Sequence, residues 1–395
     1  MKNRIVLTAF ISLIIFAATI FSSCSLIGVK RLDKIAVNGD YTFVSNYGVT
    51  HNGKDKQFEK SIKSALKSNG EKVYEPRYSP SVVAYNNGKL FFTYNYYNKS
   101  LTDDWDSDYT RKFCAGYVDV ADLSVYFLGC YQYTIPYSSN GLLTRLVGDA
   151  LVLFHREGLI EIYNISTAEK SGEITAEYLS GYDYSSKECN PDSPEIAFYK
   201  SQTGKMIFID GECAIKEVSI DFGESDITKF YGFTSDYLLF YSSSGEDIDI
   251  AAYDRQTYSL ADDETAQAVR EEIDNYNSSS KVEYGGETYT YSVSDEEIVF
   301  KSQSGEQTTL TITDLRVSSE ELRKVEEIFG GELSFKQVEA ANGELYIVAK
   351  NDESFFGMVM FSHVTPPIVF KYDMNGTFEY IGRASGSYVV TIIKN

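Results

Sequence analysis

Short apolar runs, each placed directly after turn-forming residues, recur along the chain. In the clearest copy, Asn342-Gly343-Glu344 leads into Leu345-Tyr346-Ile347-Val348. Short runs that are bounded by turn formers and rich in aromatic and β-branched residues predict β-strands. The runs recur roughly every 45 residues, which predicts an all-β repeat fold. Their leading residues are Thr42, Leu90, Leu151, Ile196, Leu238, Ile298, Leu345 and Tyr388.

A second recurring feature ends the third strand expected in each unit. It is a bulky residue followed by Asp or Asn, just before a short turn. The copies are Val118-Asp119, Tyr163-Asn164, Ile209-Asp210, Tyr253-Asp254 and Tyr372-Asp373. The feature resembles the dipeptide that closes the third strand of each blade in WD-repeat propellers, with the tryptophan replaced. This resemblance covers residues 34–395, implies a β-propeller, and brings no particular activity with it.

The C-terminal segment bears on the number of blades. The segment between Asp373 and Tyr388 is too short to hold two more strands. The run from Tyr388 to Ile393 is therefore predicted to complete the N-terminal unit. We expect seven four-stranded blades closed by pairing of the N- and C-terminal strands, with a few short helical insertions; six and eight blades remain alternatives. The rival fold is a pair of β-sandwiches.

Five segments interrupt the repeat. Residues 95–112, 349–367 and 52–70 are expected between the second and third strands of their blades. Residues 265–275 and 319–329 have helical spacing and are expected between one blade and the next. In a propeller both kinds of connection emerge on the same face, so we expect that face to bind the ligand.

The interruption after Tyr94 combines aromatic rings with carboxylates. Rings offer a stacking face and carboxylates accept hydrogen bonds, which suits the capture of a sugar or a peptide. A calcium loop is disfavoured because Tyr109 and Ala115 stand where Gly and Glu are required. The alternative is a solvated acidic loop. The candidate binding residues are Tyr96, Tyr97, Asp104, Trp105, Asp106 and Asp108.

A second candidate binding segment is strongly apolar. Exposed, it would be a surface for a protein partner; the alternative is a long hairpin packed against the scaffold. Its candidate residues are Phe355, Phe356, Met358, Met360 and Phe361.

The N-terminal residues predict where the protein is located. Lys2 and Arg4 precede an uncharged apolar run over residues 5–21, which Ser22-Ser23-Cys24 follows. This resembles a bacterial lipoprotein signal with Phe21 in place of the usual leucine, and it implies lipidation of Cys24. We expect a signal peptide at 1–23, a lipidated tether at 24–33 and the propeller at 34–395. An uncleaved anchor is the alternative; either way the protein faces away from the cytoplasm at a bacterial membrane.

Four cysteines remain after the signal. An even number in an oxidising compartment permits two disulfides. Cys114 and Cys130 flank a predicted turn symmetrically, and Cys189 and Cys213 bracket another. The possible bridges are therefore Cys114–Cys130 and Cys189–Cys213, with four buried thiols as the alternative.

Composition narrows the class of function. The chain has 32 Tyr and 24 Phe, which favours strands, and a formal charge of −21, which repels nucleic acid. His51, His155 and His363 are far apart in sequence and none has a metal-ligand neighbour, so neither a metal nor another cofactor is expected. The Gly48–Asp55 segment lacks the hydroxyl of a phosphate-binding loop and is interpreted as a turn.

These observations favour a binding protein over an enzyme. We expect a membrane-anchored, extracytoplasmic propeller that captures a protein or a polysaccharide on the face with the insertions. One alternative is a glycan-active hydrolase or lyase that uses a carboxylate pair. Another is a structural subunit of an envelope complex. The sequence leaves the oligomeric state open.

Overall fold

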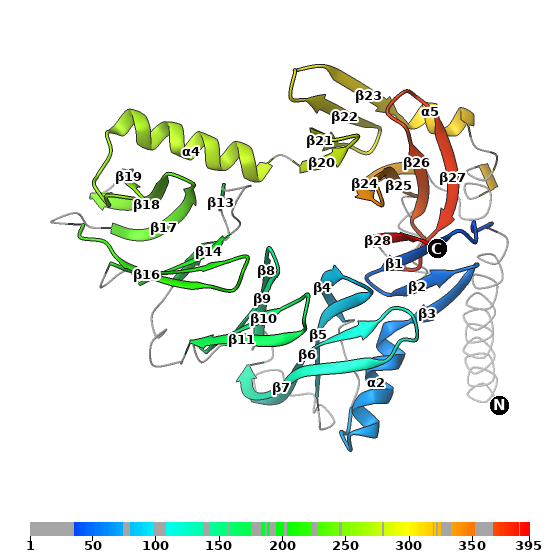
Figure 1. Ribbon diagram of the computed structural model, residues 1–395, viewed down its shortest axis with the longest axis horizontal. Helices are drawn as coiled ribbons and strands as arrows, with labels where there is room; N and C mark the ends of the chain where they lie inside the picture. Colours follow the sequence, from blue (N-terminus) through cyan, green and yellow to red (C-terminus); the bar gives the residue numbers. More distant parts are fainter. Residues whose placement is uncertain are drawn as a thin grey trace, which may run out of the picture. The chain divides into compact units, whose positions relative to one another are not determined.

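The fold was analysed in a computed structural model. It describes residues 35–73, 80–97, 108–136, 142–155, 159–174, 183–185, 188–189, 195–200, 204–222, 227–244, 247–278, 280–318, 320, 323–324, 333–351, 366–386 and 388–395. Within these ranges the strands form seven four-stranded sheets (Figure 1). The fold is a β-propeller, and the chain divides into two compact units, each described here by itself.

Three sheets of the unit Ile62–Ser280 follow the chain in simple order. The first holds β4 (Ser81–Asn86), β5 (Lys89–Tyr97), β6 (Asp108–Asp119) and β7 (Val125–Pro136). The second holds β8 (Leu142–Val147), β9 (Ala150–His155), β10 (Ile160–Asn164) and β11 (Glu169–Ile174). The third holds β12 (Asp183–Ser185), β14 (Glu195–Lys200), β15 (Lys205–Asp210) and β16 (Ile215–Ser219).

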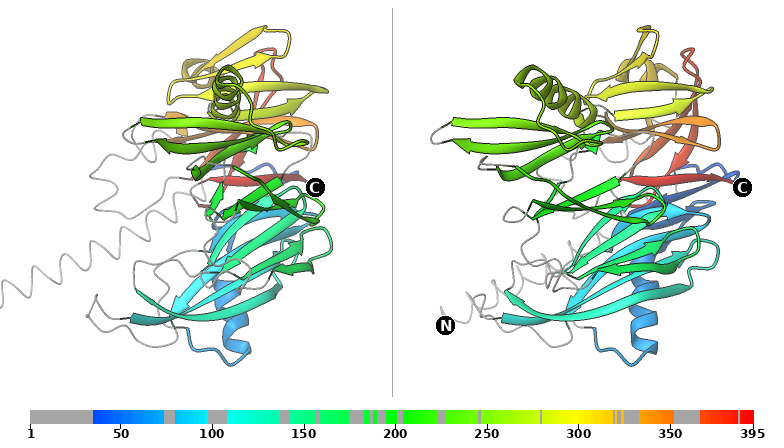
Figure 2. Two further views of the ribbon diagram at one scale, coloured as in Figure 1. Left: turned by 90° about the vertical axis from the view of Figure 1, so that its left-hand side faces the viewer. Right: turned by 60° about the vertical axis from the view of Figure 1, so that its left-hand side comes forward.

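The fourth sheet of this unit is irregular. Its consecutive strands are β17 (Ile227–Thr234), β18 (Tyr237–Ser244) and β19 (Asp247–Asp254), and the short β13 (Glu188–Cys189) pairs with β17 in parallel. Helix α4 (Asp263–Ser278) packs against these strands through Ala266, Val269 and Ile273 (Figure 2). Their spacing places the three residues on one face of the helix.

The other unit holds the described residues up to Ser61 and Lys281–Asn395. Its first sheet holds β1 (Tyr41–Ser45), β2 (Gly48–His51), β3 (Lys54–Gln57) and β28 (Val389–Lys394). Its second sheet holds β20 (Ser280–Tyr284), β21 (Glu287–Val293), β22 (Glu297–Ser302) and β23 (Gln307–Thr311). Its third sheet holds β24 (Leu333–Ala341), β25 (Glu344–Asn351), β26 (Ile368–Tyr372) and β27 (Phe378–Arg383). Helix α2 (Phe58–Ser68) follows β3 and crosses the unit boundary, and α5 (Ile312–Ser318) follows β23.

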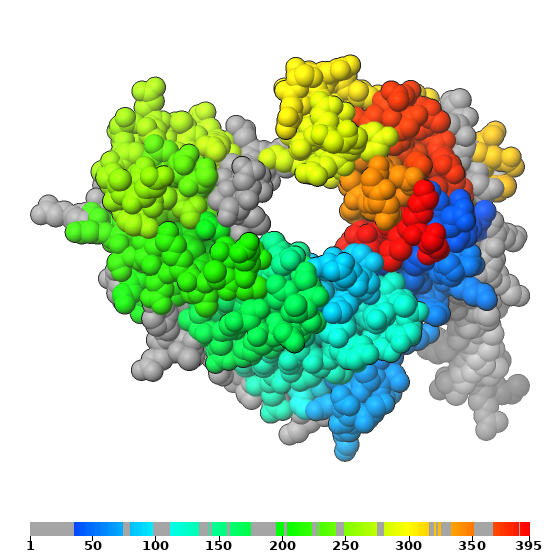
Figure 3. All heavy atoms as spheres, viewed as in Figure 1, coloured from blue at the N-terminus to red at the C-terminus, as the bar shows by residue number. Residues whose placement is uncertain are grey.

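The C-terminal strand completes the N-terminal sheet, as predicted. β28 pairs antiparallel with β1, from Tyr41 opposite Lys394 to Ser45 opposite Val389. The Thr42 hydroxyl also donates to Asn395 Oδ1 over 2.9 Å. Figure 3 shows the C-terminal residues in red against the N-terminal strands in blue. The two chain ends thus hold each other in one sheet, which covers an edge of β1.

The Asp or Asn after each third strand has a local function. The side chains of Asp119, Asn164, Asp210, Asp254 and Asp373 each accept a hydrogen bond from the backbone N–H two residues later. This Asx arrangement stabilises the turn that follows the strand. Turn formation therefore explains the recurring Asp or Asn of the feature that resembles the WD dipeptide.

Most interruptions differ in extent from the expectation. Residues 52–70 hold the β2–β3 turn, β3 and α2, so the helix connects one sheet to the next. Residues 265–275 lie in α4, as predicted, and the described residues of 319–329, which are 320 and 323–324, are also helical. The segments 95–112 and 349–367 are shorter interruptions than expected because β5, β6 and β25 extend into them. Paired backbone groups continue each ladder beyond the turn-rich residues that suggested a loop.

The core lies between neighbouring sheets. Val152 and Ile162 of β9 and β10, for example, share a buried cluster with Phe198 and Ile209 of β14 and β15. Within this unit, these two sheets thus bury apolar faces against each other. In the part of the chain that the structure describes, no helix is long and apolar enough to cross a membrane.

Candidate functional site

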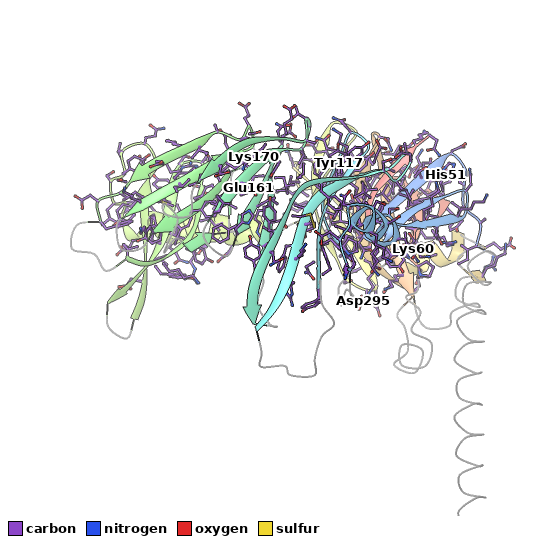
Figure 4. The ribbon with its side chains drawn as sticks, turned by 90° about the horizontal axis from the view of Figure 1, so that it is seen from below. His51, Lys60, Tyr117, Glu161, Lys170 and Asp295 are labelled. Carbon is purple, nitrogen blue, oxygen red and sulfur yellow. A yellow bond between two sulfur atoms is a disulfide. The ribbon has the colours of Figure 1, made fainter. Side chains whose placement is uncertain are left out.

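The candidate site is built on the extended ends of β5, β6 and β7. The ends of β6 and β7 project beyond the neighbouring strands in Figure 4. Their register places Tyr97 opposite Arg111 and Arg111 opposite Tyr133, so the three side chains share one face of the sheet. Arg111 is 3% exposed and Tyr97 is 2% exposed. A buried charge of this kind needs partners.

The partners of Arg111 in this row are aromatic. Its Nη2 donates to the Tyr97 hydroxyl over 2.6 Å, and its guanidinium carbon lies 5.1 Å from the centroid of the Tyr97 ring. The Phe113 ring is 5.7 Å away. Stacking on rings suits the planar, weakly hydrated guanidinium better than it would suit an ammonium. Arg111 therefore fixes the strand ends on either side of residues 98–107.

A second group of polar side chains extends this row to the adjacent sheet. Tyr133 hydrogen-bonds His155 Nδ1, and His155 Nε2 lies 2.9 Å from Glu161 Oε2. The Tyr131 hydroxyl donates to the same carboxylate. Lys170 Nζ donates to Glu161 Oε1 over 2.6 Å; Figure 4 labels Glu161 and Lys170 on adjoining strands. We call Tyr131, Tyr133, His155, Glu161 and Lys170 the buried network; Tyr133, His155 and Glu161 are buried, whereas Lys170 is exposed.

The hydrogen bonds decide the charges in the buried network. Burial alone would raise the pKa of Glu161, but donors from Lys170, Tyr131 and His155 hold that pKa below its ordinary value. Burial would lower the pKa of Lys170, yet hydrogen bonds to Glu161 and Glu173 raise it. Burial and then the hydrogen bond to Glu161 raise the pKa of Tyr131. Glu161 is thus a carboxylate held by charged and neutral donors.

This arrangement limits the chemistry of Glu161. A general acid must carry a proton near neutral pH, and a general base must have a lone pair aimed at its substrate. Glu161 is ionised, and Lys170, Tyr131 and His155 occupy its oxygens. The buried network is therefore suited to holding two sheets together and fixing the strand ends, because every member engages another.

The binding residues predicted from the sequence lie near this network, but no member of the network was predicted. Tyr96 and Tyr97, expected in a loop, are strand residues of β5 with 0% and 2% exposure. Asp108 is the first residue of β6. Asp104, Trp105 and Asp106 lie outside the described residues, between these strands. Their roles in binding stay predictions.

The other singled-out residues fall in undescribed ranges. Cys24 precedes the first described residue. The apolar candidates also lie outside the described residues; these are Phe355, Phe356, Met358, Met360 and Phe361. Lipidation of Cys24, and with it the division into a signal peptide at 1–23 and a tether at 24–33, stay predictions.

Of the two expected disulfides, one is formed and the other is not. Cys114 and Cys130 are joined by a disulfide between opposed residues of β6 and β7, with Cα atoms 4.2 Å apart. Cys213 has a free thiol, so the Cys189–Cys213 bridge is not formed. The reason is topological: Cys213 follows β15, whereas Cys189 belongs to β13 and pairs with β17 of the next sheet.

A sequence signal for the missed residues does exist. Glu161 is the one charge between Ile160 and Ile162, inside a run whose neighbours are buried. His155 likewise ends the apolar strand β9. A charge inside a buried strand indicates a partner on the facing sheet, but the sequence does not say which. Among the described residues, no three His, Cys, Asp or Glu side chains gather as metal ligands.

Comparison with known proteins adds limited information. No protein-family model matches the sequence, and no curated protein matches it. Among solved structures, a streptogramin B lyase is 10% identical, with 80% of this chain and 87% of that chain covered and a TM-score of 0.28. BamB from Moraxella catarrhalis is 11% identical, with 69% and 81% covered and a TM-score of 0.26.

A third solved structure gives the same level of similarity. It is a catalytically inactive variant of virginiamycin B lyase from Staphylococcus aureus with quinupristin. The two sequences are 12% identical, with 75% of this chain and 90% of that chain covered and a TM-score of 0.25. These TM-scores are low, so the propeller assignment rests on the strand pairing of this chain itself.

Proposed function

We propose that this chain is a membrane-anchored, extracytoplasmic binding protein that captures a protein or a polysaccharide. Its ligand would bind at residues 98–107, between β5 and β6, or at residues 352–365, between β25 and β26, each taken by itself. The main support for this proposal is that the strand ends flanking residues 98–107 in the sequence are held in place. There, Arg111 stacks on Tyr97, and Tyr133 is tied through His155 to Glu161. A rigid base lowers the entropy lost when a surface segment binds.

The chemistry of the buried network favours binding over catalysis. A glycosidase needs one protonated and one ionised carboxyl group facing the same substrate. Glu161 is ionised and fully engaged by donors from this chain. This supports a scaffold that presents a surface. The membrane anchor is supported by the lipoprotein-like Ser22-Ser23-Cys24 pattern.

Binding is tested on a glycan array and in a crosslinking pull-down from the native envelope, with the full chain. Trp105→Ala should abolish glycan capture if the ligand is a polysaccharide. Phe355→Ser with Phe356→Ser should remove one crosslinked component if the ligand is a protein. Tyr126→Ala is the matched control, because Tyr126 is an exposed ring at the opposite end of β7.

Two further results would decide against parts of the proposal. Turnover of any glycan by the purified chain would favour the hydrolase or lyase. Retention of Cys24→Ser in the membrane fraction, with no loss relative to the parent chain, would contradict anchoring through a lipid on Cys24.

A further inference from the structure

The outer strand β7 differs from the other outer strands of the described sheets. It has 12 residues, Val125–Pro136, and none of them is Asp, Glu, Lys or Arg. The outer strands β3, β11, β16, β19 and β27 have between 4 and 8 residues and all carry charges. β23 is uncharged but has only 5 residues. Charge and short length are how proteins protect an open edge, and β7 has neither.

The free edge of β7 is exposed. β7 is the last strand of its sheet and pairs with β6 alone among the described strands. None of the residues from Val125 to Gln132 is buried. One register shift, between Ala115 and Gly116, divides the strand, and Gly129–Pro136 then pairs with Asp108–Ala115 without interruption. This second segment offers a regular edge.

The Cα–Cα distance between the two bonded cysteines shows which backbone groups of β7 point away from β6. In an antiparallel pair, opposed residues with Cα atoms about 4.5 Å apart do not hydrogen-bond each other, and their N–H and C=O groups point away from the partner strand. Cys114 and Cys130 have Cα atoms 4.2 Å apart and belong to this class. Lys112 and Gln132 are two residues further along the same register. The backbone groups of Cys130 and Gln132 therefore point to the open edge.

Contacts with neighbouring strands hold Gly129–Pro136 in place. The disulfide joins it to β6, Tyr131 donates to Glu161, and Tyr133 bonds His155. An edge that is already ordered loses little conformational entropy when another strand pairs with it. β7 therefore combines an unprotected edge with a fixed geometry.

We propose that the edge of β7 at Gly129–Pro136 binds an extended segment of a partner protein as a fifth strand. The occupant is a polypeptide because the outward N–H and C=O groups alternate as in a ladder, which a polysaccharide does not match. The formal charge of −21 disfavours a second copy and favours a segment with basic flanks. This rests on the proposed function, that of a binding protein, and goes beyond it by adding a second binding surface and its class of partner.

The test uses the full chain in detergent and a synthetic peptide. In this probe, threonine and valine alternate over the length of Gly129–Pro136, and lysines flank both ends. Binding is followed by calorimetry and by hydrogen exchange of the β7 amides. Gln132→Pro removes an outward N–H without removing a bond to β6, because proline is tolerated on an edge. Gln132→Ala keeps that N–H and is the matched control.

The expected result is binding of the probe by the parent chain and by Gln132→Ala, with protection of β7 amides. Gln132→Pro should weaken binding more than about tenfold, as should methylation of the peptide amides that face β7. Equal binding by Gln132→Pro, or no binding by the parent chain, would overturn the proposal. So would a dimer of the parent chain that Gln132→Pro dissociates, because the occupant would then be a second copy.

These outcomes are separate from the test of the proposed function. Absence of both glycan capture and envelope capture by the parent chain, with intact probe binding, would uphold the β7 edge alone. Loss of probe binding in Gln132→Pro with retained glycan capture would uphold both, because the two ligands would bind at different places on the chain.

Discussion

Two glutamates, one in each unit, show how donors decide the charge of a buried carboxyl group. Glu161 accepts hydrogen bonds from Lys170, Tyr131 and His155, and its pKa lies below the ordinary value. Glu339 in β24 has one recorded side-chain donor, the amide of Gln337. The pKa of Glu339 is raised to about 7 by burial, although the hydrogen bond from Gln337 acts to lower it. Burial alone is therefore a poor guide to charge.

The two sites also differ in what they hold. Glu161 ties β7 to β9 and β10 through its donors. Glu339 lies beside the closing strand, since Gln337 Nε2 donates to the Val389 carbonyl over 2.7 Å and Gln337 Oε1 accepts from the Val389 N–H. Glu161 stabilises its site as a carboxylate, whereas the raised pKa of Glu339 favours its protonated form.

The largest effect is expected for Glu161→Ala. Removal of the carboxylate leaves the buried His155 and the partly buried Tyr131 without their shared acceptor, and it releases the exposed Lys170. We expect the free energy of unfolding to fall by about 3 kcal/mol. Urea denaturation followed by circular dichroism measures this loss. Glu173→Ala is the control, because it removes an exposed partner of Lys170 and should cost less than about 1 kcal/mol. Equal losses in the two variants would contradict the role given to Glu161.

The next largest effect concerns pH and Glu339. A carboxyl group with a raised folded-state pKa binds its proton more tightly when folded, so its stabilisation is complete below the unfolded-state pKa and is lost as pH rises through about 7. We expect stability to fall by at most about 3 kcal/mol between about pH 4.5 and about pH 8. Glu339→Gln should remove this part of the pH dependence and be more stable than the parent chain at the upper end of this range.

Thermal denaturation of both chains across this pH range measures the effect. The opposite slope, with Glu339→Gln less stable than the parent chain at the upper end, would show that Glu339 is ionised and paired in the folded state. Glu161 should have the opposite pH dependence. Its lowered pKa means that its contribution is complete above the unfolded-state pKa and is lost as pH falls through the folded-state value.

A smaller effect is expected for Lys170→Met. The methionine keeps much of the aliphatic packing but removes the charged donor to Glu161. We expect a loss of about 1–2 kcal/mol at neutral pH and a shift of acid unfolding to higher pH, because the pKa of Glu161 rises. Acid titration followed by tyrosine fluorescence measures the midpoint. An unchanged midpoint would show that Tyr131 and His155 alone keep Glu161 ionised.

The smallest effect is expected for Gln337→Met. This change removes the amide that links Glu339 to Val389, and it should cost about 1 kcal/mol in mildly acidic buffer. The cost should grow with pH, because Glu339 loses its recorded donor. Asn342→Ala is a useful comparison, since Asn342 also donates to β28, at the Ile392 carbonyl, but lies away from Glu339. A pH-dependent cost in Asn342→Ala as well would point to a general loosening of β28.

Much of the fold was predictable because local chemistry determines it. Leu90, Leu151, Ile196, Leu238 and Leu345 all lie in the second consecutive strand of their sheets. Ile298 is the exception, in the third strand β22 of its sheet. The Asp or Asn turns and the closing pair of strands were also readable from turn residues and from the length after Asp373. Such features depend on neighbours in sequence.

The candidate site was less predictable because its contacts are distant in sequence. Arg111, Tyr133, His155 and Glu161 come from four strands in two sheets. Their pairing depends on register, which a single sequence does not specify. The expected loop at 95–112 also misassigned Tyr96 and Tyr97, because aromatic residues suit both an exposed binding loop and a buried strand.

The pairing of β28 with β1 has a consequence for the order of assembly. A ribosome makes the chain from its N-terminus, so β1 is complete long before its partner exists. The first sheet stays one strand short until Val389–Lys394 have left the ribosome. Newly made chains must therefore spend their synthesis with an open first sheet. Loss of these final residues by an early stop codon would leave every such molecule permanently in that state.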